Sequence, residues 1–285
     1  MKTRILKYMV VALAFIFSGC SDGEVLKVVT LNIRFDNQGD SLNAWPNRAD
    51  YVAEFLNREQ PDIIGLQEVL WHQYEYLTEE MKGYGSVAAG RDDGQMNGEM
   101  CPLFYRSDRY EMIESGTFWL SETPDMPGSK GPGAALPRIV TWAHIKEKSS
   151  GRKMHFFNTH FSHISDSARR MSAMILSGAV RNIAGEGFYI VAGDFNLLPD
   201  SRAYEVLTGE GTLWHVLYDS YNLSDSLPQG PEYTYNGFSD KPGAGRIDYI
   251  FVPAATKVLS HTTVVAKRGD LFISDHWPVV VKILW

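Results

Sequence analysis

GFYIVAGDFN, residues 187–196, is an apolar run that ends abruptly in an acidic residue and an amide. DIIGLQE, residues 62–68, repeats the pattern, since a short apolar run leads directly to Glu68. Apolar runs of this length, bounded by polar residues, predict strands that are buried on both faces. A charge at the end of a buried strand is costly to desolvate, so something must compensate it there. The two segments therefore predict a sheet that carries reactive groups at its strand ends.

Similar segments recur along the chain. Further strands are expected at 25–31, 84–89, 102–106, 110–120, 138–147, 153–160, 246–252, 257–266 and 277–284. Helical spacing of apolar residues predicts helices from Pro46 to just before Pro61, from Trp71 to Met81, and over 166–183. A polar loop is expected between the first strand and the first helix. Strands clearly outnumber helices, and the expected class is α+β.

Length and composition are those of an ordinary globular protein. The chain has 285 residues, of which 44% are apolar and 21% charged. This balance excludes the disordered, collagen-like and coiled-coil classes. No repeat, low-complexity tract or long linker marks a domain boundary, so we expect one domain over residues 20–285.

The first 19 residues have the pattern of a secretory signal peptide that is cleaved before Cys20. Three basic residues precede the apolar run 9–17, and small residues follow it. The run is too short to span a bilayer. Residues 17–20, FSGC, resemble a bacterial lipobox, which implies export and a lipid anchor on Cys20 in the bacterial cell envelope, in the periplasm or at the cell surface. Secretion without an anchor is the alternative, because Phe17 stands where Leu is usual.

The expected mature chain is acidic. Removing residues 1–19 leaves 24 basic and 34 acidic residues, a net charge of −10. No basic stripe of the kind that binds nucleic acid by counterion release is visible. Cys101 then remains as the one cysteine besides Cys20, so no disulfide is expected, and Cys101 is interpreted as a small core residue. No protein partner is evident from the sequence.

Polar residues at the strand ends favour a hard metal ion. Taken singly, each has a plain alternative, because Asp194 and Asn196 could form a turn and Glu68 could cap a helix. Together they offer carboxylate and amide oxygens, the donors that Mg²⁺ prefers, with Mn²⁺ as a possible substitute. The sequence contains no zinc motif, phosphate-binding loop or serine-hydrolase elbow.

The ordered set of motifs resembles the endonuclease/exonuclease/phosphatase superfamily, in particular its pancreatic deoxyribonuclease branch. The motifs are LNIR (31–34), LQEV (66–69), NTH (158–160), GDFN (193–196), RIDY (246–249) and SDHWP (274–278). The resemblance covers about residues 25–285. It implies a four-layer α/β/β/α sandwich in which two mostly antiparallel or mixed sheets pack face to face between helices, with the site at one end.

The resemblance also implies a metal side of the site. Glu68 matches the principal metal ligand, Asn32 its companion at the metal or its water, and Asp275 a further carboxylate. Arg34 matches the deoxyribonuclease branch. Other branches have an acid there, so Arg34 weakens the case for a second carboxylate at that metal site.

A second group of residues is implied in catalysis. Asp194 matches the carboxylate that orients or deprotonates the attacking water, and Asn196 its partner on the phosphate. Asp248 resembles the acid that holds His276. His160 is similar to the second histidine of the deoxyribonuclease branch, and Glu99 sits where that branch places its paired acid. Arg138 and Arg169 are candidate phosphate-binding residues, and the alternative for each is a solvated surface charge.

These observations predict an exported, Mg²⁺-dependent phosphoesterase that hydrolyses a phosphodiester or phosphomonoester by in-line attack of water. The molecule that it binds and hydrolyses would be a phosphorylated small molecule, a lipid head group or a nucleic acid. An extracytoplasmic nuclease acting on DNA or RNA is the alternative within the enzyme class. A binding module that grips a phosphate ligand without turnover is the alternative outside it.

Overall fold

Strand β1 (Val25–Asn32) lies in the middle of a six-stranded sheet, with apolar residues buried on both of its faces. The computed structural model describes residues 23–209 and 217–285. In the first sheet β1 is parallel to β2 and antiparallel to β14. The strand order is β11 (Lys257–Thr263), β14 (Val279–Leu284), β1, β2 (Ile63–Gln67), β4 (Leu103–Arg106) and β3 (Tyr84–Val87).

A second six-stranded sheet packs against the first. Its parallel pair is β7 and β8, and its other pairings are antiparallel. The order is β5 (Tyr110–Trp119), β6 (Ile139–Glu147), β7 (Lys153–His160), β8 (Phe188–Asp194), β10 (Asp248–Val252) and β9 (Tyr218–Asp219). A separate hairpin joins β12 (Lys267–Arg268) to β13 (Leu271–Phe272).

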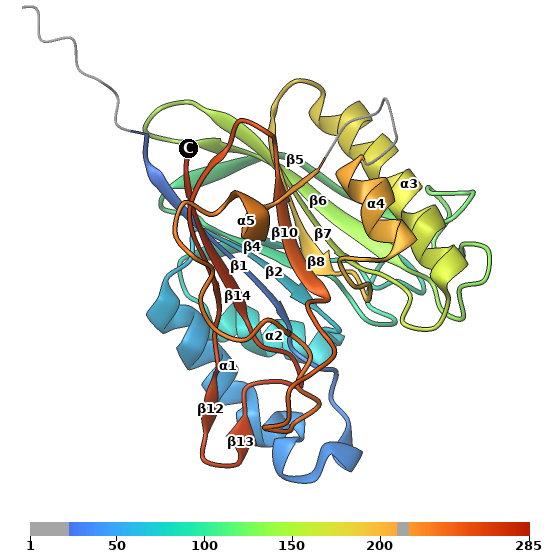
Figure 1. Ribbon diagram of the computed structural model, residues 1–285, viewed down its shortest axis with the longest axis vertical. Coiled ribbons are helices and arrows are strands. Elements are labelled where there is room, and N and C mark those ends of the chain that lie inside the picture. Colours follow the sequence, from blue (N-terminus) through green and yellow to red (C-terminus); the bar gives the residue numbers. More distant parts are fainter. Residues whose placement is uncertain (1–22, 210–216) are drawn as a thin grey trace, which may run out of the picture.

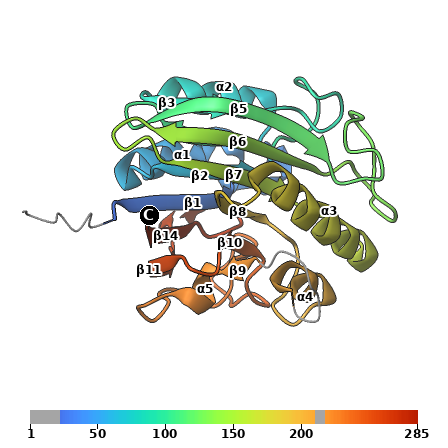
Figure 2. The ribbon, with the colours of Figure 1, turned by 90° about the horizontal axis from the view of Figure 1, so that it is seen from above.

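Helices cover the outer faces of the two sheets. Helices α1 (Trp45–Glu59) and α2 (Trp71–Glu80) lie on the first sheet, and α3 (Asp166–Ala184) and α4 (Arg202–Thr208) on the second (Figure 1). Figure 2 shows β1 and β2 of one sheet beside β7 and β8 of the other. The predicted four-layer α+β sandwich is therefore confirmed.

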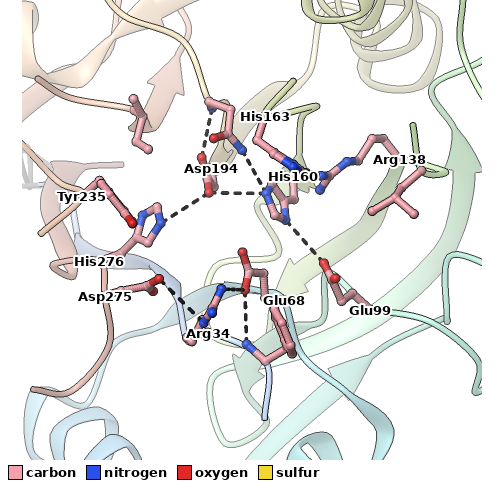
Figure 3. A pocket seen from close by; sticks show the side chains of 14 residues that line it. Arg34, Glu68, Glu99, Arg138, His160, His163, Asp194, Tyr235, Asp275 and His276 are labelled. Atoms are coloured by element: carbon pink, nitrogen blue, oxygen red, sulfur yellow. Dashed lines mark hydrogen bonds and ion pairs between the residues drawn. The ribbon is translucent and has the colours of Figure 1, made fainter. Parts of the chain in front are cut away.

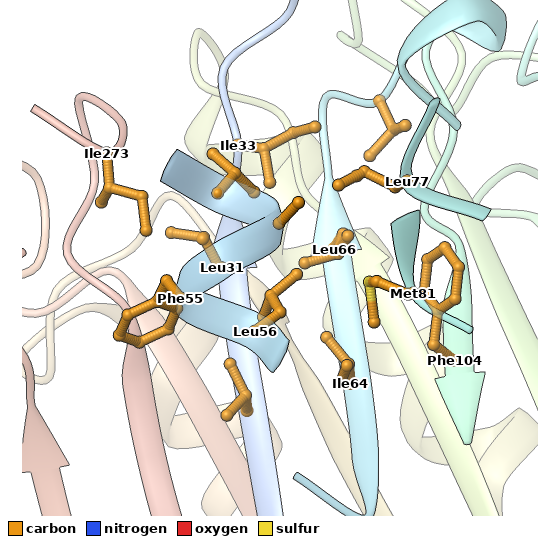
Figure 4. Close-up of a cluster of buried hydrophobic side chains, with 14 of the residues drawn as sticks. Leu31, Ile33, Phe55, Leu56, Ile64, Leu66, Leu77, Met81, Phe104 and Ile273 are labelled. Atoms are coloured by element: carbon orange, nitrogen blue, oxygen red, sulfur yellow. The ribbon is translucent and has the colours of Figure 1, made fainter. Parts of the chain in front are cut away.

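Each of the three layer boundaries has its own apolar cluster. Along β1, Val28 faces the space between the sheets, whereas Val29 and Leu31 face α1, because successive side chains of a strand alternate. Leu56 of α1 packs into the same outer cluster (Figure 4). Truncating such a buried leucine to alanine typically costs about 2–5 kcal/mol.

Most predicted elements lie within a few residues of their expected bounds, and a few short ones are additional. The polar loop after β1 contains a 3₁₀ helix, η1 (Gln38–Asn43). Helices α4 and α5 (Ser220–Leu223) were not predicted, although Ser201 caps α4 and Gly209 ends it in a left-handed conformation. Strands β9, β12 and β13 have two residues each, too few to leave a periodic pattern.

Buried amides join the sheets just below the strand ends. Gln67 donates a 2.7 Å hydrogen bond to Asn158 Oδ1, and Asn158 Nδ2 donates to the carbonyls of Leu66 and Pro102. Gly65 leaves room for this amide, because a Cβ there would lie 2.8 Å from Asn158. Asn158 therefore holds β7 against β2 and β4. No helix among residues 23–209 and 217–285 is long and apolar enough to cross a membrane.

Candidate active site

Strand ends of both sheets meet around a pocket of about 460 Å³, a volume typical of small-molecule sites. Glu68 follows β2 and Asp275 precedes β14 in the first sheet, whereas His160 and Asp194 end β7 and β8 in the second (Figure 3). The lining residues are Arg34, Phe35, Glu68, Glu99, Leu136, Arg138, His160, His163, Asp194, Asn196, Tyr235, Ile247, Asp275 and His276.

Nine of the twelve residues singled out in the sequence line this pocket. Asn32 and Asp248 lie directly behind it, hydrogen-bonded to residues that do. Asn32 Nδ2 donates to Glu68 Oε1 at 3.1 Å and to Asp194 Oδ2 at 3.0 Å, so it ties the two sheets together at the pocket floor.

Arg169 lies apart from the other predicted site residues. It lies on α3 and does not line the pocket, because its guanidinium donates to the carbonyl of Ser162 and to Asp166, close to its own helix. The structure does not bring Arg169 into the pocket, and its phosphate-binding role stays a prediction.

Three residues of the pocket have a strained backbone. Arg34, Glu68 and Asn196 have φ values of 59°, 60° and 50°, in the left-handed region that residues with a side chain rarely adopt. Such conformations persist only where the surroundings over-determine them, and they cluster at functional sites. The hydrogen bond from the Phe35 amide to Glu68 Oε2, at 3.2 Å, is one such constraint.

Asp194 lies at the centre of the site. Its side chain is buried, and its Oδ2 is 3.5 Å from His160 Nε2 and 3.7 Å from His276 Nε2. The backbone N–H of Asn196 donates a hydrogen bond to Asp194 Oδ1 at 2.9 Å. Burial and the nearby charge of Asp248 raise the pKa of Asp194 to about 7. The carboxyl group can therefore exchange a proton near neutral pH.

The two histidines have opposite protonation behaviour. Burial lowers the pKa of His160, and the positive charge of Arg138 lowers it further, so its ring is neutral and can accept from Asn196 Nδ2 at 3.0 Å. Burial also opposes the charged form of His276. Even so, the carboxylates of Asp248 and Asp194 raise its pKa well above the usual value, which favours the imidazolium.

Glu99 has a closer partner than the predicted one. Its Oε2 is 3.9 Å from His160 Nδ1, beyond hydrogen-bond range, but only 2.7 Å from Arg91 Nη1. On the same side of the pocket, Arg138 Nη2 lies 3.0 Å from His163 Nδ1, so the Arg138 guanidinium is held at the pocket wall.

The structure adds a buried arginine that the sequence analysis missed. Arg48 of α1 is fully buried, and its guanidinium donates to the carbonyls of Asn43, Ile33, Arg34 and Ile273. These carbonyls flank Arg34 on one side and Asp275 on the other. A signal existed, because Arg48 falls on the apolar stripe of the predicted helix, where a charged residue is out of place.

The oxygen-rich donor set fits a hard divalent cation. Among the described residues, Asp194, Asp248 and His276 form a close group of possible ligands, with atoms within 4.8 Å of one another. His276 Nδ1 and Asp248 Oδ2 are already hydrogen-bonded at 2.8 Å, so we interpret this group as a hydrogen-bonded chain. Glu68 and Asp275 add carboxylate oxygens on the facing side of the pocket.

Comparison with known proteins agrees with this geometry. A sequence model described as the endonuclease/exonuclease/phosphatase family matches residues 29–276, which include the lining residues from Arg34 to His276. The chain belongs to this family. Its membership confirms the predicted enzyme class, a hydrolase of phosphoric esters.

Three family relatives are similar over most of the chain. A Bacteroides vulgatus endonuclease/exonuclease/phosphatase is 39% identical, with a TM-score of 0.86, over 91% of this chain and 98% of that chain. A Bacteroides thetaiotaomicron mannosyl-6-phosphatase is 34% identical, with a TM-score of 0.83, over 91% and 100%. Tyrosyl-DNA phosphodiesterase 2 of Bos taurus is 26% identical over 92% of this chain and 68% of its own length.

Proposed function

We propose that this family member is an exported, Mg²⁺-dependent phosphoesterase that hydrolyses a small phosphorylated molecule by in-line attack of water. The main support for this proposal is the position of Asp194, whose carboxylate lies within 4 Å of both His160 and His276. The same pocket is lined by the carboxylates of Glu68 and Asp275. An acid with a pKa near 7 and a charged imidazole beside a cluster of metal-binding oxygens suit phosphoester hydrolysis.

In this proposal Glu68 holds the ion at its Oε1, next to Asn32, and Asp275 adds a further negative charge on the far side of Arg34. Bound there, Mg²⁺ would neutralise charge on the phosphoryl oxygens. Asp194 orients the attacking water and takes its proton, because its buried carboxylate lies between His160 and His276 and has a pKa of about 7. His276, held by Asp248, and Asn196 donate hydrogen bonds to the phosphoryl oxygens.

The substrate is proposed to be a phosphomonoester of a sugar or a similar polar head group. The pocket has the size of a small molecule, and Tyr235 is 47% exposed beside the His276 ring, where it can stack on a sugar face. Leu136 and Ile247 add apolar surface to the pocket lining. The name of the mannosyl-6-phosphatase relative supports this substrate class.

A phosphodiesterase or nuclease is the second candidate. It is favoured by the similarity to tyrosyl-DNA phosphodiesterase 2. The net charge of −7 for the full sequence gives duplex nucleic acid little electrostatic attraction. A binding module without turnover is disfavoured, because strained backbone and a carboxyl pKa near 7 coincide in one pocket.

A substrate panel tests the proposal. The purified protein is assayed with Mg²⁺ or with a chelator on sugar phosphates, an aryl phosphodiester and single-stranded and duplex oligonucleotides. We expect Mg²⁺-dependent release of phosphate from sugar phosphates, lost in Glu68→Gln and retained in Glu79→Gln, an exposed glutamate of α2. Preferential cleavage of oligonucleotides would establish the second candidate, and binding without turnover of any substrate would refute both.

Export and lipidation are proposed from the N-terminal sequence alone. The signal segment 1–19 and Cys20 lie outside the described residues. Expression of Cys20→Ser beside the unchanged sequence, followed by membrane fractionation and labelling with a fatty-acid analogue, tests the anchor. Loss of label and release from membranes are expected, and unchanged fractionation would reject lipidation.

A further inference from the structure

Arg34 lies between two carboxylates of the pocket. Its Nη1 is 3.9 Å from Glu68 Oε2, and its Nε is 3.8 Å from Asp275 Oδ2 (Figure 3). We propose that the Arg34 guanidinium occupies the position of a second metal ion, so that this site binds a single divalent cation and uses the arginine as its other fixed positive charge. The inference rests on the proposed function and concerns the number of ions at the same site.

The side chain of Arg34 is held in one place. Its Nε donates to Asp40 Oδ2 at 2.9 Å and its Nη2 to Asp40 Oδ1 at 3.2 Å, a two-point contact that fixes the plane of the guanidinium. The group also lies 4.4 Å from the centre of the Phe35 ring. Asp40 is itself positioned by a hydrogen bond from Asn37 in the same loop.

The backbone of Arg34 is fixed as well, in a strained left-handed conformation. Its N–H donates to Asn32 Oδ1 at 2.9 Å, and its carbonyl accepts from Arg48 Nη2 at 2.8 Å and from Gln73 Nε2 at 3.1 Å. The contacts come from β1, α1 and α2. Contacts from three secondary-structure elements thus hold Arg34 in a backbone conformation that it would not otherwise prefer, which is typical of a functional site.

A second ion would compete directly with this guanidinium. Mg²⁺ binds carboxylate oxygens at about 2.0–2.1 Å, so an ion shared by Glu68 and Asp275 would have to enter the space that Arg34 occupies. It would also face a like charge at short range. An arginine guanidinium stays protonated in proteins, so the group remains cationic beside Asp40, Glu68 and Asp275.

The proposed single ion lies at the other carboxylate oxygen of Glu68, which does not contact Arg34. There, Oε1 accepts from Asn32 Nδ2, which also donates to Asp194. An amide N–H₂ group that spans two carboxylates marks a place where positive charge is favourable. With one ion on that side and Arg34 on the other, a phosphate in the pocket would meet two positive charges, one of them a planar fork of donors.

The number of bound ions tests the proposal without reference to turnover. Isothermal titration calorimetry and electron paramagnetic resonance with Mn²⁺ are carried out on the purified full chain. We expect one Mn²⁺ per chain, with a resonance spectrum that shows no magnetic coupling to a second Mn²⁺ ion. We expect the Glu68→Gln variant to bind no Mn²⁺. Two ions, no ion, or an ion that survives Glu68→Gln would overturn the inference.

Two substitutions at Arg34 sharpen the test. Arg34→Asn removes the charge and should admit a second, weaker Mn²⁺, whereas Arg34→Lys keeps a charge and should still bind one. If Arg34→Asn binds only one ion, or Arg34→Lys binds two, then Arg34 does not determine the number of bound ions. Arg58→Asn, at a side chain 62% exposed on α1, is the matched control and should bind one ion. A chain that binds one ion and hydrolyses no phosphoester would refute the proposed function alone.

Discussion

His276 Nδ1 lies 2.8 Å from Asp248 Oδ2, and both side chains are buried where the segment before β14 of the first sheet meets the start of β10 in the second. Only His276 reaches the pocket, where its Nε2 faces Asp194. Asp248 therefore cannot contact a ligand in the pocket itself, but its negative charge acts on the His276 imidazole, which can. An oriented, charged histidine is the form suited to hydrogen-bonding a phosphoryl oxygen.

Asp248→Asn should lower the His276 pKa, because it removes the neighbouring carboxylate charge that raises it. We expect kcat/KM to fall by about 10²-fold or more, and the alkaline limb of the pH–rate profile to move to lower pH. Asp225→Asn, an exposed aspartate 3.8 Å from Lys257, serves as control and should leave the profile unchanged. An alkaline limb that stays in place would contradict the role of Asp248.

Asp194→Asn should stabilise the metal-free protein at high pH. The folded-state pKa of Asp194, about 7, exceeds the ordinary 3.8, so its contribution to stability is fully present below pH 3.8 and is lost as the pH rises through 7. We expect the variant to melt at least about 2 °C above the unchanged protein at pH 8, the shift that about 1 kcal/mol gives in a chain of this size. The difference should shrink at pH 5. Calorimetry with a chelator present measures it, and equal melting temperatures at pH 8 would refute the prediction.

Arg48→Met should destabilise the fold and impair the site together. The substitution removes the Arg48 donor from four buried or half-buried carbonyls, of which the Arg34 carbonyl keeps Gln73 Nε2 as a second donor, and each group left unsatisfied costs about 1–3 kcal/mol. We expect a loss of about 3–5 kcal/mol in urea unfolding and a fall in kcat, because Arg34 and Asp275 lose their backbone support. Arg48→Lys should recover part of both, and Arg58→Met should change neither. A Met variant with unchanged kcat would limit Arg48 to a purely structural role.

Two glycine substitutions should have opposite effects. In Gly65→Ala the new Cβ would lie 2.8 Å from the buried Asn158 amide, which must then shift from its hydrogen bonds, so we expect a loss of about 1–3 kcal/mol. Gly178→Ala, at an exposed position of α3 with nothing within 4 Å of the new atom, should stabilise by about 0.5–1 kcal/mol. Urea titrations measure both changes. A neutral Gly65→Ala would mean that the sheets can separate slightly at this point.

The sequence alone determined the fold class and the set of polar residues that gather at the pocket. Long apolar runs such as the one before Asp194 can be satisfied only inside a packed sheet, and the polar residues that end them must then lie at the edge of that sheet. These local patterns do not depend on which strands are neighbours, so they could be identified one segment at a time.

Only the tertiary structure decided how those residues act on one another. Neutral His160 and charged His276 are the same residue type, and what separates them is Arg138 beside one ring and Asp248 behind the other. In the same way, Arg34 lies near both Glu68 and Asp275 because segments far apart in the chain converge. Burial and charge at short range set pKa values and contacts, and these depend on distances between strands that no local sequence pattern encodes.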